Sequence, residues 1–587
     1  MPVHTSRGFA ITVAVVAILG LNWMVSLYTD WLWFGAVGYE GVFWRTVQAR
    51  LGSGMLLGAV AAAVIGINLH LACRRAGGGL ALGRSPFASG PSPLAALLRS
   101  RKPYLLATAG LGLLMGGLAA SQWPLLWRFL HAQPFGVADP IFGRDIGFYV
   151  FSLPFYRFLV DFLIFALVLS AAAVVLVYVA GGAIQVQPTP HLMPRPLVHL
   201  SALGGALLLL LAATYRLKVY GLLFGEGRIY AGAGYADVHV QTRVYWALAV
   251  LLVAAAGLLL LNLKGRRPRR WLLRVGLAAL GALVVGAVPG RLVQALVVDP
   301  NELEKEGPYM AHNIRATRAA YALDRIAERP FEVEESLTRG DIEANPLTIR
   351  NVRVWDQPPM AEAYQQIQTI RPYYVFPEVD VDRYHIDGVY RQVMLAGREL
   401  DTRRLPPQAR KWVNEWLQYT HGYGVSMSPV NRITPEGLPD FFMRDIPPVA
   451  TSPELALQRP EIYYGERTHG AVVVNTGVEE FDYPRGDENV FSTYEGTGGV
   501  GLAGYLTRLA FAVRFRSPNL VLSSYIRPDS QLLLYRHILE RARQVAPFLL
   551  YDQDPYLVVA EGRLFWILDA YTTTDMYPYS RRAAGRA

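Results

Sequence analysis

Cysteine is almost missing from the sequence, since Cys73 is the only one among 587 residues. A single thiol excludes an intrachain disulfide and a cysteine-based zinc site. Cys73 stands next to Arg74 and Arg75 and has no second thiol at a motif spacing. We interpret it as a small apolar side chain near a helix end, in preference to a redox centre.

Acidic residues are scarce in the first half of the chain. Residues 1–293 contain 24 Lys and Arg but 7 Asp and Glu, a net charge of +17, whereas residues 294–587 contain 32 and 39, a net charge of −7. Basic residues between apolar segments typically lie at lipid head groups. The overall charge of +10 therefore does not indicate a nucleic-acid partner, and we expect none.

Established catalytic and cofactor motifs are also missing. The sequence contains neither HExxH nor a Walker loop, and Gly424 to Ser428 lacks the final glycine of a nucleophile elbow. Gly496, Gly498 and Gly501 match GxGxxG, but no convincing buried strand precedes them, so a flexible turn before a helix is the favoured interpretation. We expect no cofactor, and the catalytic residues of any enzyme of this type stay unknown.

Long hydrophobic runs are abundant instead. A membrane-spanning helix needs about 20 apolar residues, because it crosses about 30 Å at about 1.5 Å per residue. Seven runs meet this requirement, at residues 8–28, 51–71, 104–126, 156–180, 197–215, 244–263 and 271–293. The first run lacks a small-residue cleavage site and is followed by further spans, which predicts an uncleaved anchor.

The composition changes between about residues 264 and 321. Basic residues fill 264–270, an apolar run follows, and acids begin at Asp299. The loops after the second and sixth predicted spans carry Lys and Arg without an acid, so we predict that both loops and the N-terminus are cytoplasmic. With seven spans, the chain after about residue 293 is then extracytoplasmic. The predicted domains are a transmembrane bundle at 1–298 and an extracytoplasmic domain at 299–587.

Charged and polar residues inside the spans are few. Asp161 is the one acid well within an apolar run, and Arg157 precedes it by one helical turn. We expect an interfacial salt bridge between them, in preference to a proton relay. Four further polar residues are too scattered in the sequence to predict a relay, namely Asn22, Asn68, His70 and His199.

Small and aromatic residues in this half predict how the helices pack and where they meet the head groups. Glycines four residues apart let helices approach closely. These pairs are Gly54 and Gly58, Gly112 and Gly116, and Gly286 and Gly290. Aromatic residues cluster between the spans, as at Trp31, Trp33, Trp123 and Phe148, and we interpret them as an interfacial belt in preference to a binding groove.

The second half of the chain predicts an α+β fold. Asp387-Gly388 and Glu561-Gly562 are two-residue hairpin signals, placed between 379–386 and 389–396 and within 555–573. Residues 471–475 predict a strand. Helices are predicted at 308–328, 406–418, 500–516 and 530–545.

Two groups of acids in this half are candidate metal ligands, since carboxylates suit hard cations. The groups are Asp380, Asp382 and Asp387, and Asp552, Asp554 and Asp569. The calcium-loop template fails because Tyr384 stands at a ligand position, and turn formation beside Pro555 explains Asp552 and Asp554 equally well. Both interpretations stay open.

His421 is the candidate catalytic base, with Ser426 and Ser428 nearby in the sequence. A nucleophile and its base meet in space, so closeness along the chain carries little weight. A structural, hydrogen-bonded histidine is the favoured interpretation.

Several distinctive motifs resemble those of one protein family. They are TDWLWF at 29–34, FYVFSLPFY at 148–156, RPYY at 371–374, DVDRY at 380–384, YTHGYG at 419–424, EFDYP at 480–484, APFL at 546–549 and DAYTT at 569–573. Together they look like an uncharacterised family of large bacterial multi-pass membrane proteins with about seven spans and a bulky extracytoplasmic portion. The resemblance implies a plasma-membrane location and carries over no reaction, cofactor or catalytic residue. Because such proteins usually continue well past YPYS at 577–580, we expect that this chain is shortened at its C-terminus.

Three classes of function remain at this stage. A membrane-tethered binding or scaffolding protein is favoured, because the outer domain is large and catalytic spacing is missing. Its expected partners are the lipid bilayer and other components of the cell envelope. An envelope enzyme would need His421 to meet a carboxylate and a serine in one cleft. A transporter or channel would need a continuous polar path that includes Asp161.

Overall fold

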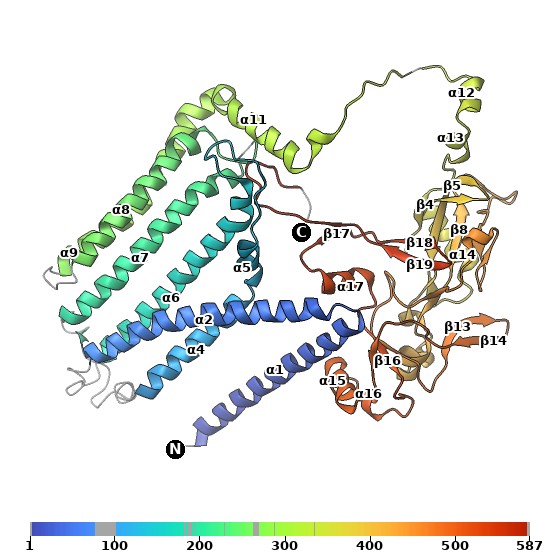
Figure 1. Ribbon diagram of the computed structural model, residues 1–587, viewed down its shortest axis with the longest axis horizontal. Coiled ribbons are helices and arrows are strands. Elements are labelled where there is room, and N and C mark those ends of the chain that lie inside the picture. Colours follow the sequence, from blue (N-terminus) through green and yellow to red (C-terminus); the bar gives the residue numbers. More distant parts are fainter. Residues whose placement is uncertain are drawn as a thin grey trace. The chain divides into compact units, whose positions relative to one another are not determined.

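The computed structural model describes residues 3–76, 101–180, 183–185, 191–192, 194–227, 229–261, 269–286, 288–333 and 335–583 (Figure 1). The chain forms two compact units. Unit 1 comprises residues 1–44 and 330–573, and unit 2 comprises residues 45–329 and 574–587. These units differ from a division at residue 298, because packing joins the first helix to the sheets and the last residues to the helical unit. The predicted division at residue 298 into a part in the membrane and a part in water stays a prediction.

Unit 2 is helical. Its helices are α2 (Glu40–Ala76), α4 (Arg101–Ala120), α5 (Trp123–Leu130), α6 (Leu153–Ala180), α7 (Pro194–Gly221), α8 (Thr242–Leu260), α9 (Arg269–Val285), α10 (Val288–Val293) and α11 (Glu302–Ala320). A π-helical turn, Phe148–Ser152, leads into α6 and another, Asp237–Gln241, into α8. The short strands β1 (Ile184–Gln185) and β2 (His191–Leu192) pair with each other.

Four described helices are long and apolar enough to cross a membrane. They run over Glu40–Arg75, Phe148–Ala180, Arg195–Phe224 and Asp237–Leu260. A fifth span results if Tyr104–Ala120 and Trp123–Leu130 are taken together, although they meet at 66°. The described residues therefore support four or five of the seven predicted spans. The predicted span 8–28 falls on α1, and 271–293 is interrupted at Gly286, so that α9 has 17 residues.

Glycines bring α2 and α4 into close contact, as their spacing predicts. A Cβ on Gly54 would lie 2.9 Å from the carbonyl oxygen of Gly116, and one on Gly58 would lie 2.8 Å from that of Gly112. A side chain at any of these four positions would push the helix backbones apart. Further along α2, one face is buried, with Leu57, Ala61, Ile65, Leu69 and Ala72 at helical spacing.

Unit 1 contains a five-stranded antiparallel sheet in the order β10-β9-β8-β5-β4. The strands are β4 (Asp380–Ile386), β5 (Val389–Gly397), β8 (Val425–Pro429), β9 (Met443–Arg444) and β10 (Val449–Ala450). Alternate side chains of a strand point to opposite sides. The last five residues of β5 are all buried, so this part of the strand is covered on both faces. Met394 packs with Tyr364 of α14 (Gln357–Gln368), whereas Leu395 packs with Leu557 of the hairpin β18 (Tyr556–Ala560) and β19 (Arg563–Ile567).

A second, three-stranded sheet in the order β12-β16-β15 has its own core. Its strands are β12 (Val472–Val474), β15 (Val500–Gly501) and β16 (Gln531–Leu533). It packs with α15 (Tyr505–Phe515), α16 (Asn519–Leu522) and the end of α1 (Val3–Ala36). Trp33 of α1 is 2% exposed within this core and its ring lies 4.7 Å from that of Tyr535. The predicted position of Trp33 in an interfacial belt is therefore wrong.

The remaining elements of unit 1 are short. They are α12 (Arg339–Ala344), α13 (Pro346–Arg350), α17 (Ile538–Val545), β3 (Tyr374–Val375), β6 (Glu399–Leu400), β7 (Gly422–Tyr423), β11 (Glu461–Ile462), β13 (Glu480–Arg485), β14 (Glu488–Ser492), β17 (Leu550–Tyr551) and β20 (Ala570–Tyr571). They form antiparallel pairs β3-β6, β7-β11, β13-β14 and β17-β20. Unit 1 is therefore α+β, as its sequence predicts.

The two hairpin predictions are confirmed. Ile386 pairs with Val389 around Asp387-Gly388, and Ala560 pairs with Arg563 around Glu561-Gly562. All four turn residues have positive φ, between 51° and 72°, as a type I′ turn requires. The strand predicted at 471–475 is confirmed as β12.

The helix boundaries were predicted less well. Helix α11 begins at Glu302 and carries Pro308 in its interior, whereas we predicted 308–328. The predicted helix 530–545 is strand β16 followed by α17, and 406–418 contains a 3-10 turn at Pro407–Ala409 and a π-helical turn at Asn414–Gln418. The predicted 500–516 shortens to α15, since β15 occupies its start.

Residues 574–583 pack on unit 2. Tyr579 is fully buried there, and its hydroxyl donates to the carbonyl oxygen of Ala233 at 2.7 Å. Asn313 of α11 donates to the carbonyl oxygen of Tyr579 at 2.7 Å. This segment therefore holds α11 against the loop before α8.

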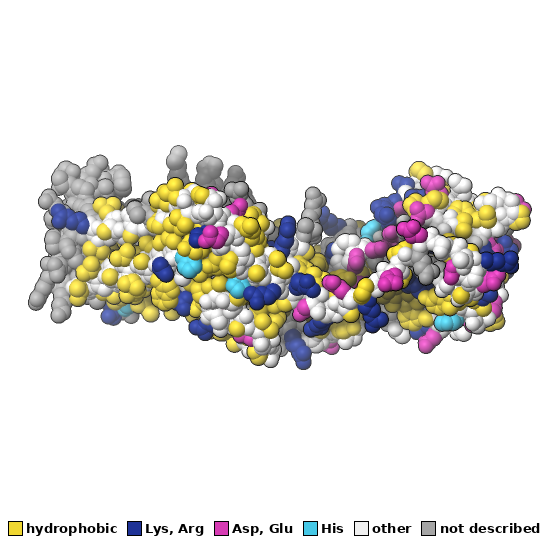
Figure 2. Space-filling view, turned by 90° about the horizontal axis from the view of Figure 1, so that it is seen from above, with side chains coloured by type: hydrophobic (Ala, Val, Ile, Leu, Met, Phe, Trp, Pro, Cys, Tyr) yellow, Lys and Arg dark blue, Asp and Glu magenta, His cyan; other side chains and the backbone are white. Residues whose placement is uncertain are grey.

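The surfaces of the two units differ in chemistry. Figure 2 shows the helices of unit 2 covered largely by hydrophobic side chains, and acidic side chains gathered over parts of unit 1. Exposed apolar residues on α4 and α6 include Leu106, Leu113, Phe165 and Leu176. Such a surface is typical of a helix that faces lipid, and the first half of the chain is thus compatible with a membrane location.

Candidate functional site

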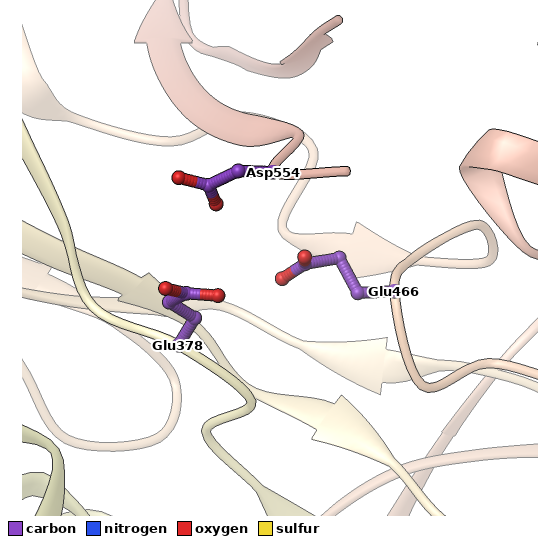
Figure 3. A group of neighbouring side chains, drawn as sticks. All are labelled: Glu378, Glu466 and Asp554. Atoms are coloured by element: carbon purple, nitrogen blue, oxygen red, sulfur yellow. The ribbon is translucent and has the colours of Figure 1, made fainter. Parts of the chain in front are cut away.

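Three carboxylates from distant parts of unit 1 converge at one place. Glu378 precedes β4, Glu466 lies between β11 and β12, and Asp554 precedes β18. One carboxylate oxygen from each lies within 4.8 Å of the other two. Figure 3 shows the three side chains pointing toward a common space. Glu378 and Asp554 are exposed, and Glu466 is partly buried.

The loop that carries Glu466 is held by a fourth acid, Glu399. This carboxylate is fully buried and accepts hydrogen bonds from the backbone amides of Glu466 at 2.7 Å and Arg467 at 2.8 Å, and from the hydroxyl of Thr468 at 2.8 Å. Residue 465 is a glycine because a Cβ there would overlap the Glu399 carboxylate. The loop geometry therefore depends on a charged group whose oxygens are satisfied by donors.

The strand that carries Asp380 places a further carboxylate beside the three. Asp380 accepts a hydrogen bond from the amide of Leu557 at 3.1 Å, which ties the start of β4 to β18. Burial, with help from the nearby carboxylates of Asp554 and Glu378, raises the pKa of Asp380 to about 7. Burial and the charges of Glu399 and Asp380 raise the pKa of Glu466 to about 8. Burial and Asp554 also raise the pKa of Glu378.

Burial is the largest cause of these pKa shifts, and repulsion among the neighbouring carboxylates adds to it. Arg467 is the only cation among the causes of the shift at Glu378, where it acts in the opposite direction. Calcium binds carboxylate oxygens at about 2.3–2.6 Å, so that two ligands on opposite sides of an ion are about 4.8 Å apart. The spacing of the three oxygens therefore fits a hard divalent cation between them.

The structure separates the six acids that the sequence singled out. Asp380 and Asp554 lie at the carboxylate cluster. Asp387 is at the far end of β4, where its amide donates to Glu454, and Asp552 accepts from the amide of Gln553 at 2.7 Å. Asp382 accepts from the amide of Arg383 at 2.7 Å, and the carbonyl oxygen of Asp569 accepts from the amide of Asp552. Metal binding by any of the six stays a prediction.

Sequence reasoning missed Glu378 and Glu466. Glu378 is two residues before Asp380, so the alternation of an extended chain places both on one side. That signal was available in the sequence. Glu466 lies 86 residues after Asp380 in a loop, and no local pattern connects it with the other acids.

The buried histidine His421 is part of a separate network. Its Nε2 lies 2.9 Å from Asp482 and its Nδ1 lies 2.8 Å from the hydroxyl of Thr420, which donates to Glu480 at 2.7 Å. Tyr463 also donates to Glu480 at 2.9 Å. The ring of His421 is 0% exposed, so a substrate has no access to it in this conformation.

Serine does join this network, but not as a nucleophile of His421. Ser492 donates to Asp482 Oδ1, the same oxygen that lies 2.9 Å from His421 Nε2. Ser426 and Ser428 are buried, and neither hydroxyl bonds His421 among the described residues. A triad would require the serine to bond the histidine. The arrangement agrees with the structural interpretation of His421.

Among the polar groups inside the helices of unit 2, two sets bear on the sequence predictions. In the first set, Nδ1 of His199 in α7 lies 2.8 Å from the hydroxyl of Tyr178, and its Nε2 lies 3.0 Å from Oδ1 of Asn68. Asn68 and His199, which are 131 residues apart in the sequence, thus meet across two helices, and the expectation that the scattered polar residues form no relay stays a prediction. Arg157 and Asp161 form the second set, which lies roughly 25–31 Å along α6 from Tyr178 at about 1.5 Å per residue.

The predicted salt bridge between Arg157 and Asp161 is absent from the ion pairs of the described residues. Both side chains instead line a cavity. One helical turn of separation permits pairing, but side-chain direction decides whether it occurs.

The glycine motif at 496–501 is not a dinucleotide site. Gly498 donates its amide to the hydroxyl of Tyr494 at 3.1 Å, and Gly501 lies in strand β15. Helix α15 begins four residues later at Tyr505. A phosphate at this loop would therefore not meet a helix N-terminus, which the fingerprint requires.

Comparison with known proteins identifies the family. The sequence profile of the Uncharacterised protein family (UPF0182) matches residues 8–587. The chain belongs to this family. Among its curated members, a UPF0182 protein of Pelotomaculum thermopropionicum is 42% identical over 98% of this chain and 64% of its own length. One of Cupriavidus necator and one of Bradyrhizobium diazoefficiens are each 41% identical over 98% of this chain and 63% of theirs.

The chain thus spans a little under two thirds of the length of these UPF0182 relatives. No solved structure matches it. Membership of the UPF0182 family confirms the resemblance that the motifs indicate, and it assigns no activity to this chain.

Proposed function

We propose that this protein is an integral membrane protein. Its unit 1 lies on the extracytoplasmic side of the membrane and binds other components of the cell envelope. The four or five apolar helices support the membrane location. The basic loops after the second and sixth predicted spans support the orientation, since Lys and Arg favour the cytoplasmic side.

One observation carries the proposal, namely that the end of helix α1 is built into the core of unit 1. Arg514 of α15 donates to Asp30 at 2.6 Å and to Tyr535 at 2.6 Å, and Tyr535 donates to Asp30 at 3.0 Å. Trp33 completes the apolar core beside this ion pair. A domain that shares its core with a membrane helix is held rigidly at the bilayer surface, which suits a binding or scaffolding role.

The carboxylate cluster is the proposed binding element of this domain. Calcium takes 6–8 oxygen ligands, and three carboxylates supply only part of them. An ion held by Glu378, Glu466 and Asp554 would keep coordination positions for oxygens of a second molecule. Phosphate and carboxylate groups of envelope components have the required chemistry.

The other two function classes fit the structure less well. An enzyme that uses His421 is disfavoured because Asp482, Glu480 and the ring itself are buried. A transporter is disfavoured because buried residues between Asp161 and Tyr178 on α6 are mainly apolar, as at Phe162, Ala166, Leu167 and Val174. A polar path along α6 would need polar groups at these positions.

Affinity capture tests the binding role. The tagged full-length protein is purified from its native membrane, with calcium or with a chelator, as wild type, Glu466→Gln and the control Glu436→Gln. Glu436 is an exposed acid on a turn. We expect that wild type and the control retain an envelope partner in calcium, and that the chelator and Glu466→Gln each release it. Equal recovery under all conditions would contradict a cation-dependent role.

Orientation has its own test. A protease added outside intact cells should cut within 326–337, where residues 326–333 and 335–337 are exposed, and leave the basic loops intact. Protection of 326–337 in intact cells, with cleavage only after lysis, would overturn the proposed orientation.

A further inference from the structure

A cavity of about 470 Å³ lies in unit 2 between α6, α7 and α8. Arg157 and Asp161 of α6 line it, together with Thr214 and Lys218 of α7 and Tyr245 of α8. Its volume is within the range of small-molecule sites. The cavity opens near the start of α6 and α8 and the end of α7, which share one end of the helical unit.

No ion pair among the described residues holds the two cations of this cavity, although the carboxylate of Asp161 lines the same cavity. In the described part of the chain the guanidinium of Arg157 has no hydrogen bond or ion pair. A Cβ built on Gly221 would lie 2.5 Å from Nη2 of Arg157, so the guanidinium packs against the backbone of this glycine. The ammonium of Lys218 lies 4.7 Å from the ring of Tyr215 and has no carboxylate partner there.

A neighbouring arginine shows the contrast. Arg216 donates to the hydroxyl of Tyr220 at 2.6 Å, and its guanidinium lies 4.5 Å from the rings of both Tyr220 and Trp246. Arg216 is thus satisfied by the protein, whereas Arg157 has its donors free. A cation without acceptors beside an apolar bundle is costly, so an anion at this cavity would be stabilising.

The shape of the surface next to the cavity points to an amphiphile. On α6, Arg157, Asp161, Phe165 and Val168 recur at spacings of four, four and three, which places them on one face. Phe165 is 55% exposed and Val168 is 47% exposed. An apolar stripe therefore leads away from the cations along the helix, where an acyl chain would lie.

We propose that this cavity binds the head group of a phospholipid, with the phosphodiester on Arg157 and Lys218. Asp161 lies at the same cavity, and its carboxylate suits an ammonium group. The three charges together match a zwitterionic head group such as phosphatidylethanolamine, with the acyl chains along Phe165 and Val168. This inference rests on the proposed membrane location.

Ligand-induced stabilisation tests the site on the full-length protein in detergent. The probes are phosphatidylethanolamine, phosphatidylglycerol and inorganic phosphate, and the readouts are the thermal midpoint and bound lipid in native mass spectrometry. We expect saturable binding of phosphatidylethanolamine, weaker binding of phosphatidylglycerol and none of phosphate. Binding of phosphate alone, or equal and non-saturable uptake of both lipids, overturns the proposal.

Variants locate the binding. Arg157→Gln and Lys218→Gln should each weaken phosphatidylethanolamine binding about tenfold, since each removes a charge-assisted hydrogen bond. Arg243→Gln is the matched control, because Arg243 is an exposed arginine near the same end of α8 that does not line the cavity. Equal affinity of all three variants overturns the assignment to this cavity.

A measurement on the wild type guards against misfolded variants. A photoactivatable phosphatidylethanolamine should cross-link to α6 within residues 157–168 or to α7 within 214–221. Cross-links only elsewhere overturn the proposal. Recovery of the protein in the washed membrane fraction is scored separately, so that loss of selective lipid binding with membrane retention contradicts this inference alone.

Discussion

Two groups of acids in unit 1 have opposite surroundings. Glu480 and Asp482 are buried beside His421, and hydroxyls of Thr420, Tyr463 and Ser492 donate to them. Glu378, Glu466 and Asp554 meet near the surface, and burial together with the surrounding carboxylates raises the pKa values of the first two. The carboxylates of the first group have hydrogen-bond donors within the protein and need no ligand. The carboxylates of the second group repel one another.

The difference separates a structural network from a binding site. A buried carboxylate with several donors holds strands together, since it cannot leave its partners without a large cost. Carboxylates that face one another instead store repulsion that a cation relieves. The same residue types therefore have different roles according to the donors around them.

The largest effect is expected from His421→Leu. The change leaves Asp482 and Glu480 buried with fewer partners, and breaking a buried pair of this kind costs about 3–5 kcal/mol. Thermal unfolding of unit 1 in the purified protein should occur at a clearly lower temperature. Glu436→Gln, at an exposed turn, should change stability by less than about 0.5 kcal/mol. Equal unfolding midpoints for the two variants would contradict a structural role of the network around His421.

The wild type should respond to pH and calcium. In the folded protein, burial raises the pKa of Asp380 to about 7 and that of Glu466 to about 8, from ordinary values of 3.8 and 4.5. Acids with raised pKa values contribute stability that is present below about pH 4 and is lost as the pH rises through 7 to 8. Unit 1 should therefore lose stability from pH 5 to pH 8, with millimolar calcium restoring several degrees at pH 8. No calcium effect at pH 8 would count against the cation site.

Glu466→Gln sharpens the same comparison with a smaller effect. Removing one of the repelling charges should raise the unfolding midpoint by about 2–4 °C at pH 8 and leave it unchanged at pH 5. The variant should also lose the calcium response. A lower midpoint at pH 8 would show that Glu466 stabilises the loop in its charged form.

The smallest effects are expected at the acids outside the cluster. Asp387→Asn keeps a residue type that tolerates the positive φ of 53° at this turn. Asp552→Asn keeps an acceptor for the amide of Gln553. Calorimetric calcium titration of both variants should match the wild type within about twofold, and loss of binding in either would move the site away from Glu378 and Glu466.

Local signals in the sequence predicted the elements that depend on neighbouring residues. Asp387-Gly388 and Glu561-Gly562 specify hairpins because positive φ at two adjacent positions restricts the turn type. Gly54 and Gly58 predicted close helix packing because the absence of a Cβ permits it in any partner. The helix start at Glu302 was missed because Pro308 can lie inside a first turn or, as here, further along.

The sequence by itself thus determined the apolar helices, the α+β character of the second half and the family, since composition, periodicity and motifs are properties of the chain. Only the tertiary structure decided that Trp33 belongs to a sheet core, that Glu466 meets Glu378, and that Arg157 and Asp161 both line a cavity. Charges and rings interact over a few ångströms in space, and distance along the chain does not specify which of them come that close.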